Sequence, residues 1–292
     1  MPAHQDHPSF STLRLSVDGA VATITLDNPP VNVMSAAMLR ELATVLSDLA
    51  DDASVKVIVF DSRNPDFFIA HFDFRVVDAL SEFDDLARMA PEGLNFAQAL
   101  SERIRHQPQV TIVKLTGIAR GGGSEFALAA DMCFATPAAK LSQCEALLGV
   151  LPGGGATQYL RRRIGRNRAL EAVLGADLLD ATTLEKYGWI NRVVPADEID
   201  GFVERLAANI AALPPGTVAA VKRALPPEDE TDGLARENAI YFEQFARPAA
   251  VGLLRGALTA GAQTVRAEPD LERLLRELNI REAADAGSLA GN

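Results

Sequence analysis

Short apolar strands alternate with helical stretches through the first half of the sequence, and this alternation restricts the chain to a mixed α/β core. Residues 13–17 and 21–26 form a predicted hairpin around an Asp-Gly turn. A helix is predicted over residues 36–49, where leucines recur at helical spacing after a capping serine, Ser35. Four further apolar segments are predicted strands and one is a predicted helix: strands at residues 55–60, 110–115, 132–135 and 140–144, and the helix at 93–105.

The second half of the sequence follows a different pattern, since glycines and Pro-Pro pairs separate successive helical runs. These predicted helices cover residues 156–164, 168–174, 183–187, 199–213, 217–225, 234–245 and 250–264, with one strand at 189–194. The last segment, residues 267–292, is charged and then small and polar, which predicts a frayed terminus. We therefore expect residues 1–200 to form an α/β core domain and residues 201–292 to form a C-terminal helical region.

Composition and charge exclude several classes of protein. The 39 acidic residues outnumber the 28 basic ones, and the net charge of −11 argues against a nucleic-acid partner. The uncharged stretch at residues 146–160 contains Pro152 and a run of three glycines, so no membrane span is expected. The first ten residues have no secretory pattern, and only two cysteines occur, Cys133 and Cys144. The four histidines lack metal-ligand spacing, so we expect a cytoplasmic protein without a metal site.

Three consecutive glycines, residues 121–123, lie between a predicted buried strand and a short helix. Such a turn brings the backbone close to a ligand and points N–H groups outward, where they can stabilise a negatively charged oxygen. A dinucleotide-binding fingerprint would need another glycine where Phe126 stands, and so would a nucleophile elbow built on Ser124. Two interpretations remain: an anion site with Glu125 as an acid–base group, or a packing turn whose glutamate offsets the helix dipole.

Two other segments extend this pattern. A second glutamate, Glu145, follows Glu125 by twenty residues, and segment 66–75 follows the predicted strand at 55–60. Together with the glycine block these segments resemble the crotonase superfamily, the enoyl-CoA hydratase/isomerase family. The resemblance runs from the first hairpin to about residue 225. It also includes segment 180–195 and the spaced residues Gly149, Pro152 and Gly155.

The resemblance implies an α/β fold built as a crotonase-like spiral of β-β-α turns with a C-terminal helical appendage. It implies that the C-terminal helices cover the pocket and associate the chain into a homotrimer or a dimer of trimers. The implied substrate is an acyl-CoA, so coenzyme A enters as part of the substrate and no cofactor is permanently bound.

The family pattern also assigns site residues. The backbone N–H groups of Phe72 and Gly122 align with the oxyanion hole, which polarises a thioester carbonyl, and Glu125 and Glu145 align with the catalytic pair. Residues expected to contact the substrate or its CoA moiety are Ala70, His71, Asp73, Phe74, Arg75, Gly121 and Gly123. His71 and Phe72 depart from the family, which has a glycine and a small residue there, so we expect a narrowed acyl pocket that favours planar acyl groups.

Because hydratases of the family use both glutamates, the resemblance favours hydration of a 2-enoyl-CoA to a 3-hydroxyacyl-CoA. An enoyl-CoA isomerase or an acyl-CoA hydrolase on the same fold is the alternative reaction. A CoA-binding subunit without turnover is the alternative outside catalysis, and the exchange of residues at His71 and Phe72 motivates it.

Overall fold

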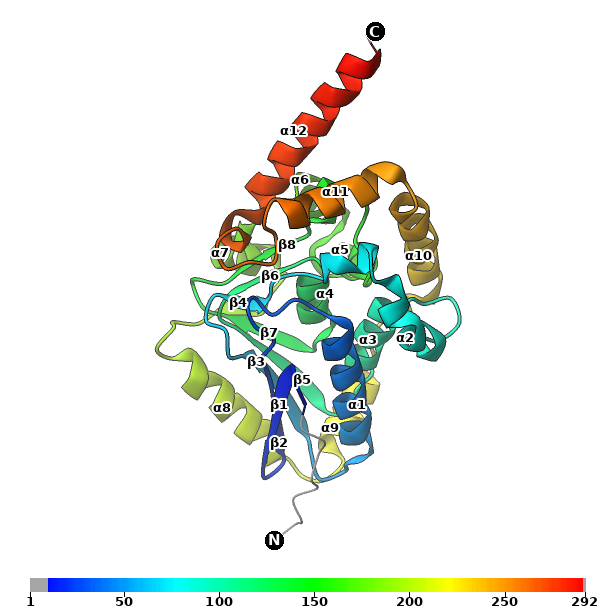
Figure 1. Ribbon diagram of the computed structural model, residues 1–292. Coiled ribbons are helices and arrows are strands. Elements are labelled where there is room, and N and C mark those ends of the chain that lie inside the picture. The colour runs from blue at the N-terminus through cyan, green and yellow to red at the C-terminus, as the bar shows by residue number, and fades with distance from the viewer. Residues whose placement is uncertain (1–9, 291–292) are drawn as a thin grey trace.

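The computed structural model describes the backbone of residues 10–290 and the side chains of residues 10–281, and it contains two sheets (Figure 1). The first sheet has six strands, and only its first pair, β1 and β2, is antiparallel. In spatial order they are β1 (Leu13–Asp18), β2 (Val21–Leu26), β3 (Val57–Ser62), β5 (Val110–Leu115), β7 (Met132–Ala135) and β10 (Arg192–Val193).

The second sheet has four short strands: β4 (Phe67–Ile69), β6 (Ile118–Arg120), β8 (Lys140–Ser142) and β9 (Leu179–Asp180). β3, β5 and β7 of the first sheet each lead directly into a strand of the second, and a helix then returns the chain. This is the expected spiral of β-β-α turns. The sequence did not predict β4 or β6, because three residues are too few to display an alternating pattern.

Local sequence signals set the helices that support the core. Ser35 caps α1 (Ala36–Asp51) by accepting a hydrogen bond from the Met38 N–H, as predicted. Asn95 and Gln98 form a capping box at the start of α3 (Phe96–Arg105). Helix α4 (Gly122–Ala129) is buried along its whole length, between β4, β6, α3 and α5 (Ala156–Ile164). Its first turn therefore lies inside the protein.

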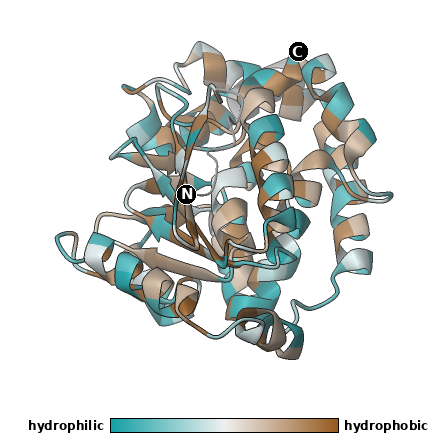
Figure 2. Ribbon diagram, turned by 90° about the horizontal axis from the view of Figure 1, so that it is seen from below, coloured by the Kyte–Doolittle hydropathy of each residue, from teal (hydrophilic) through white to brown (hydrophobic). Residues whose placement is uncertain are grey.

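Helices dominate the second half of the chain, as predicted. The remaining elements are α2 (Asp84–Met89), α6 (Arg166–Gly175), α7 (Ala181–Tyr187), α8 (Ile199–Ala211), α9 (Thr217–Ala224), α10 (Thr231–Phe245), α11 (Pro248–Thr259), α12 (Leu271–Ala290), and the 3₁₀ turns η1 (Phe74–Val77), η2 (Leu80–Phe83), η3 (Glu145–Leu148) and η4 (Glu268–Asp270). Figure 1 shows α12 projecting away from the two sheets, and the ribbon in Figure 2 is most hydrophobic towards the interior.

Several boundaries differ from the sequence prediction, including those of the strand expected at 55–60, which is β3, and of the helix expected at 250–264, which ends at Thr259. The strand expected at 189–194 is reduced to the two residues of β10, because Trp189 and Ile190 are buried in the core before it. The strand expected at 140–144 ends at Ser142, and Cys144 already precedes η3. No helix was predicted after residue 264, but Leu271–Ala290 form α12. Leucine, arginine, glutamate and alanine are strong helix formers, which explains this helix. Residues 291–292 lie outside the described part. No helix within the described residues has the length and apolarity needed to cross a bilayer.

Candidate active site

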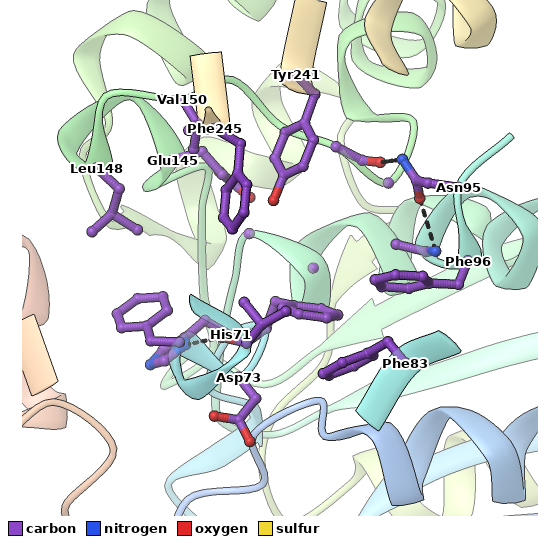
Figure 3. A pocket seen from close by; sticks show the side chains of 18 of the residues that line it. His71, Asp73, Phe83, Asn95, Phe96, Glu145, Leu148, Val150, Tyr241 and Phe245 are labelled. Atoms are coloured by element: carbon purple, nitrogen blue, oxygen red, sulfur yellow. Dashed lines mark hydrogen bonds between the residues drawn. The ribbon is translucent and has the colours of Figure 1, made fainter. Parts of the chain in front are cut away.

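A mostly apolar cavity of about 270 Å³ lies where the first turn of α4 meets loop 70–75, η3 and α10. Figure 3 shows Tyr241 and Phe245 entering it from one side and Phe83 and Phe96 from the other. The rings of Phe72, Phe83 and Phe96 stack on one another, with centroids 5.1–5.9 Å apart. The cavity can therefore hold a flat apolar group between aromatic walls.

Close approach explains the glycines at the edge of this cavity. Gly121 has φ +46°, and a Cβ there would come within 2.4 Å of a Glu145 carboxylate oxygen. A Cβ on Gly123 would lie 2.3 Å from the Ile69 carbonyl oxygen. Larger residues would displace both the glutamate and the strand that precedes loop 70–75.

Phe72 and Gly122, the two residues predicted to supply backbone donors, both line the cavity. A Cβ at Gly122 would lie 3.7 Å from the Phe72 nitrogen, so the two residues are in contact across the cavity floor. Neither the Phe72 N–H nor the Gly122 N–H donates to an acceptor within residues 10–281. Met34 holds loop 70–75 in place, because its N–H bonds to the His71 carbonyl and its own carbonyl accepts the Asp73 N–H. The arrangement offers two donors to one oxygen atom of a ligand.

Three glutamates border the cavity or lie directly behind it, and we call them the acidic cluster: the buried Glu125 and Glu237 and the half-buried Glu145. Glu125 is 4% exposed, and its Oε1 accepts the N–H groups of Gly154 (2.7 Å) and Ala156 (3.1 Å) at the start of α5. Glu145, at the start of η3, has an Oε2 atom that is buried without a hydrogen-bond partner within the described residues.

The electrostatics of the acidic cluster favour protonated carboxyls at Glu125 and Glu145. Burial and the charges of Glu145 and Glu237 raise the pKa of Glu125 well above its ordinary value, although the two backbone N–H groups oppose the increase. Burial, helped by the charge of Glu237, raises the pKa of Glu145 to about 8. The acidic cluster can therefore retain a proton at neutral pH.

Sequence reasoning missed Glu237 and Tyr241, which come from α10. Glu237 is buried beneath the start of α5, and Tyr241 lies one turn later with its ring in the cavity (Figure 3). Burial and the charges of Glu145 and Glu125 raise the pKa of the Tyr241 hydroxyl. A usable signal was present: Leu234, Glu237 and Tyr241 share one helical face, so an acidic residue stands among apolar ones.

A second group of buried ionisable side chains lies behind loop 70–75, and we call it the paired cluster: His71, Arg120, Glu268 and Glu272. The Nε2 of His71 is 3.1 Å from Glu268 Oε1, while its Nδ1 is 2.6 Å from the Phe72 carbonyl oxygen. Arg120 Nε lies 2.7 Å from Glu272 Oε1, which also accepts from Ser142. His71 and Arg120 lower the pKa of Glu268 against the effect of burial.

The other residues predicted to contact the substrate belong to loop 70–75 or to the glycine block, residues 121–123, at the start of α4. Ala70 is fully buried, and Phe74 stacks on the His71 ring with centroids 3.9 Å apart. Asp73 accepts hydrogen bonds from Arg75 and from the Gln263 side chain, while the Arg75 side chain is 64% exposed. Gly121 and Gly122 line the cavity beside both catalytic candidates. Within the described residues, no group of three His, Cys, Asp or Glu side chains is placed to hold a metal ion.

Comparisons with known proteins agree with this geometry. A family model described as enoyl-CoA hydratase/isomerase matches residues 16–250. A Bacillus subtilis protein named "Probable enoyl-CoA hydratase" is 32% identical over 214 residues, covering 73% of this chain and 81% of its own length. Human mitochondrial methylglutaconyl-CoA hydratase is 32% identical over 219 residues, covering 73% of this chain and 63% of its own length.

A solved structure is also similar to this chain. The crystal structure of a candidate enoyl-CoA hydratase from Streptomyces avermitilis superposes with a TM-score of 0.91 at 57% identity, covering 93% of this chain and 99% of that one. The fold, the matched residues and the relatives all identify one family, whose members act on CoA thioesters. The chain belongs to the enoyl-CoA hydratase/isomerase family, the crotonase family.

Proposed function

We propose that this enzyme adds water across the double bond of a 2-enoyl-CoA and so produces a 3-hydroxyacyl-CoA. The observation that carries the proposal is the presence of two buried carboxyl groups, Glu125 and Glu145, beside two unengaged backbone donors. Hydration needs one group to take a proton from water and another to deliver a proton to Cα. A site with both groups and a place for the thioester oxygen meets each requirement.

The thioester carbonyl oxygen binds between the N–H groups of Phe72 and Gly122. Negative charge develops on this oxygen when hydroxide adds at Cβ, because the electrons move through the conjugated system to the thioester. Two fixed donors stabilise that charge without reorganising during the reaction. Gly122 is the first residue of α4, so the positive end of the helix dipole adds to the effect.

The hydrogen bonds divide the roles of the two glutamates. Glu125 accepts two backbone N–H groups, which stabilises its carboxylate and suits it to take a proton from water. Glu145 has a buried oxygen without a donor, which favours its protonated form and suits it to protonate Cα. Water placed between them supplies hydroxide to Cβ and a proton to the pair, and Glu145 returns one proton to carbon.

The other expectations concern the CoA moiety and assembly. We infer that the exposed Arg75 and its neighbours on loop 70–75 contact the CoA portion of the substrate near the cavity mouth. We infer also that the helices after residue 200 mediate a homotrimer or a dimer of trimers in the cytoplasm. Exposed apolar side chains on α9, α10 and the segment between them support contacts between copies: Val221, Leu225, Ile240 and Phe242.

A panel of acyl-CoA thioesters, followed by mass spectrometry, tests this function. A 2-enoyl-CoA substrate is expected to gain the mass of one water. An unchanged mass with a moved double bond would indicate an isomerase, and release of free CoA would indicate a hydrolase. Tight acyl-CoA binding without any of these products across short, long and aromatic acyl groups would contradict catalysis.

A further inference from the structure

Four consecutive backbone N–H groups at the start of α5 are divided alternately between two carboxylates. Gly154 and Ala156 donate to Glu125, whereas Gly155 and Thr157 donate to Glu237, at 2.7 and 3.0 Å. The two glutamates come from α4 and α10, more than one hundred residues apart in the chain. Both therefore depend on the same helix terminus, and the charge on one affects the other.

The contacts of Glu237 are those of an ionised carboxylate. Its Oε1 accepts from the Gly155 N–H and the Gln98 side-chain amide, and its Oε2 accepts from the Thr157 N–H and the Thr157 hydroxyl. The Gln158 side chain donates to that hydroxyl, which leaves its own proton for Glu237. Burial raises the pKa of Glu237, and the four donors that surround the carboxylate oppose this increase by stabilising its charged form.

The other charged and titratable groups described around the acidic cluster do not supply a cation that balances the negative charge of Glu237. Glu237 faces Glu145 of η3, and beside Glu145 lies Cys144, whose thiol pKa is raised by burial. Tyr241 faces the acidic cluster from α10. From α5, the Tyr159 hydroxyl donates to Glu102, which pairs with Arg105, so that cation is already matched.

We propose that Glu237 is a positioning residue that holds a permanent negative charge at the start of α5 and thereby keeps one proton on the Glu125–Glu145 pair. The proton on Glu145 is the one that the proposed hydration delivers to carbon, so the consequence for catalysis rests on that function. The charge relation between the three glutamates does not rest on it, because it follows from their shared contacts alone.

The variant Glu237→Gln removes the charge and keeps the side-chain shape. Removing a buried unit charge within about 10 Å shifts a pKa by roughly one unit at an effective dielectric of about 20. We therefore expect the alkaline limb of the kcat/KM profile to move about one pH unit toward acid. In the free protein, infrared difference spectra should show the protonated carboxyl band disappearing at the correspondingly lower pH.

Glu230→Gln is the matched control, because Glu230 is also buried, occupies the N-cap position of α10 and pairs with Arg162. It is expected to lose stability without moving either titration. If Glu237→Gln folds and both titrations stay at their wild-type positions, the proposal is wrong. Equal shifts in the two variants would also overturn it, since they would reflect general loosening of α10.

A measurement on the unmodified chain covers the case in which Glu237→Gln does not fold. Carboxyl-labelled glutamate, followed by ¹³C NMR and assigned with Glu125→Gln and Glu145→Gln, should show Glu237 ionised at pH 7 while the pair retains a proton. A protonated Glu237 at pH 7 would overturn the proposal. Because neither spectrum requires turnover, failure to hydrate any enoyl-CoA would contradict the proposed reaction and leave this result standing.

Discussion

The protein buries two sets of ionisable side chains near one cavity, and they differ in charge balance. The acidic cluster contains three glutamates and no cation, whereas the paired cluster surrounds Arg120 and His71 with Glu268 and Glu272. Glu125 and Glu268 are almost equally inaccessible, at 4% and 0% exposure. Nevertheless, the pKa of Glu125 rises while that of Glu268 falls. Burial raises the pKa of both carboxyls, and the neighbouring glutamates add to this increase at Glu125, whereas His71 and Arg120 reverse it at Glu268.

This difference suits the acidic cluster to catalysis and the paired cluster to structural support. A carboxyl with a raised pKa can exchange a proton near neutral pH, so the acidic cluster is suited to catalysis. In the paired cluster, His71 and Arg120 stabilise the charged form of Glu268, so these contacts are suited to holding loop 70–75 against the C-terminal segment. Substitutions in each cluster should accordingly affect different properties.

The largest expected effect is on turnover in the acidic cluster. Glu125→Gln and Glu145→Gln should each lower kcat by roughly 10²–10⁴-fold, because general acid–base assistance is lost while the shape is preserved. Acyl-CoA binding, measured by calorimetry, should change little. A rate near that of the wild type in either variant would contradict the two-carboxylate mechanism.

Substitutions in the paired cluster should lower the free energy of unfolding. Glu268→Gln leaves the buried Arg120 and His71 with less compensating charge, and such losses cost about 3–5 kcal/mol of unfolding free energy. Denaturant unfolding measures the change. Glu125→Gln is the contrasting variant, because it relieves repulsion and should leave the free energy of unfolding unchanged or higher. Equal destabilisation of the two variants would remove the distinction between the clusters.

The two proposed oxyanion donors connect the clusters, since Phe72 follows His71 and Gly122 follows Gly121, which lies against Glu145. Gly122→Pro removes one N–H and should cost about 3–4 kcal/mol of barrier stabilisation. Proline fits the first position of a helix, so the fold should survive.

Gly122→Ala is the control for that substitution, because its Cβ makes only ordinary contacts and the N–H remains. Infrared spectra of a bound thioester should show a carbonyl frequency that is lowered in the wild type and less so in the proline variant. A bound wild-type thioester with an unshifted carbonyl would contradict the oxyanion assignment.

Stability should depend on pH in opposite ways at Glu145 and Glu268. The pKa of Glu145 is raised to about 8 by folding, so its contribution is complete below about pH 4.5 and is lost as pH rises toward 8. Relative to Glu145→Gln, the wild type should therefore lose up to about 1 kcal/mol per pH unit across that window.

The pKa of Glu268 is lowered, so its contribution is present above pH 4.5 and is lost as pH falls. Thermal unfolding of wild type, Glu145→Gln and Glu268→Gln between pH 2 and pH 9 checks both signs. The same slope in all three proteins would show that neither carboxyl is perturbed by folding.

The smallest expected effect concerns selectivity at Phe72. Phe72→Ala keeps the backbone N–H and removes one aromatic wall, which is worth about 1–3 kcal/mol of discrimination between acyl groups. The ratios between the kcat/KM values for a short, a long and an aromatic enoyl-CoA should fall by roughly tens of fold. Equal changes for all three substrates would reduce the role of Phe72 to packing.

The sequence by itself determined the parts of the protein that depend on neighbours along the chain. Residues 21–26 and 110–115 are strands as predicted, and Ser35 caps the predicted helix, because alternation and capping act over a few residues. The spacing of the glycine block, Glu125 and Glu145 also identified the family that the comparisons show.

Only the tertiary structure decided the surroundings of those residues. Glu237 reaches the start of α5 from a helix eighty residues later in the chain, and Glu268 reaches His71 from almost two hundred residues away. Nothing in the local pattern distinguishes Glu268, whose carboxyl is matched by a cation, from Glu125, whose carboxyl is crowded by two others. A pKa depends on distances between charges in a desolvated interior, and these distances exist only after the distant segments have packed together.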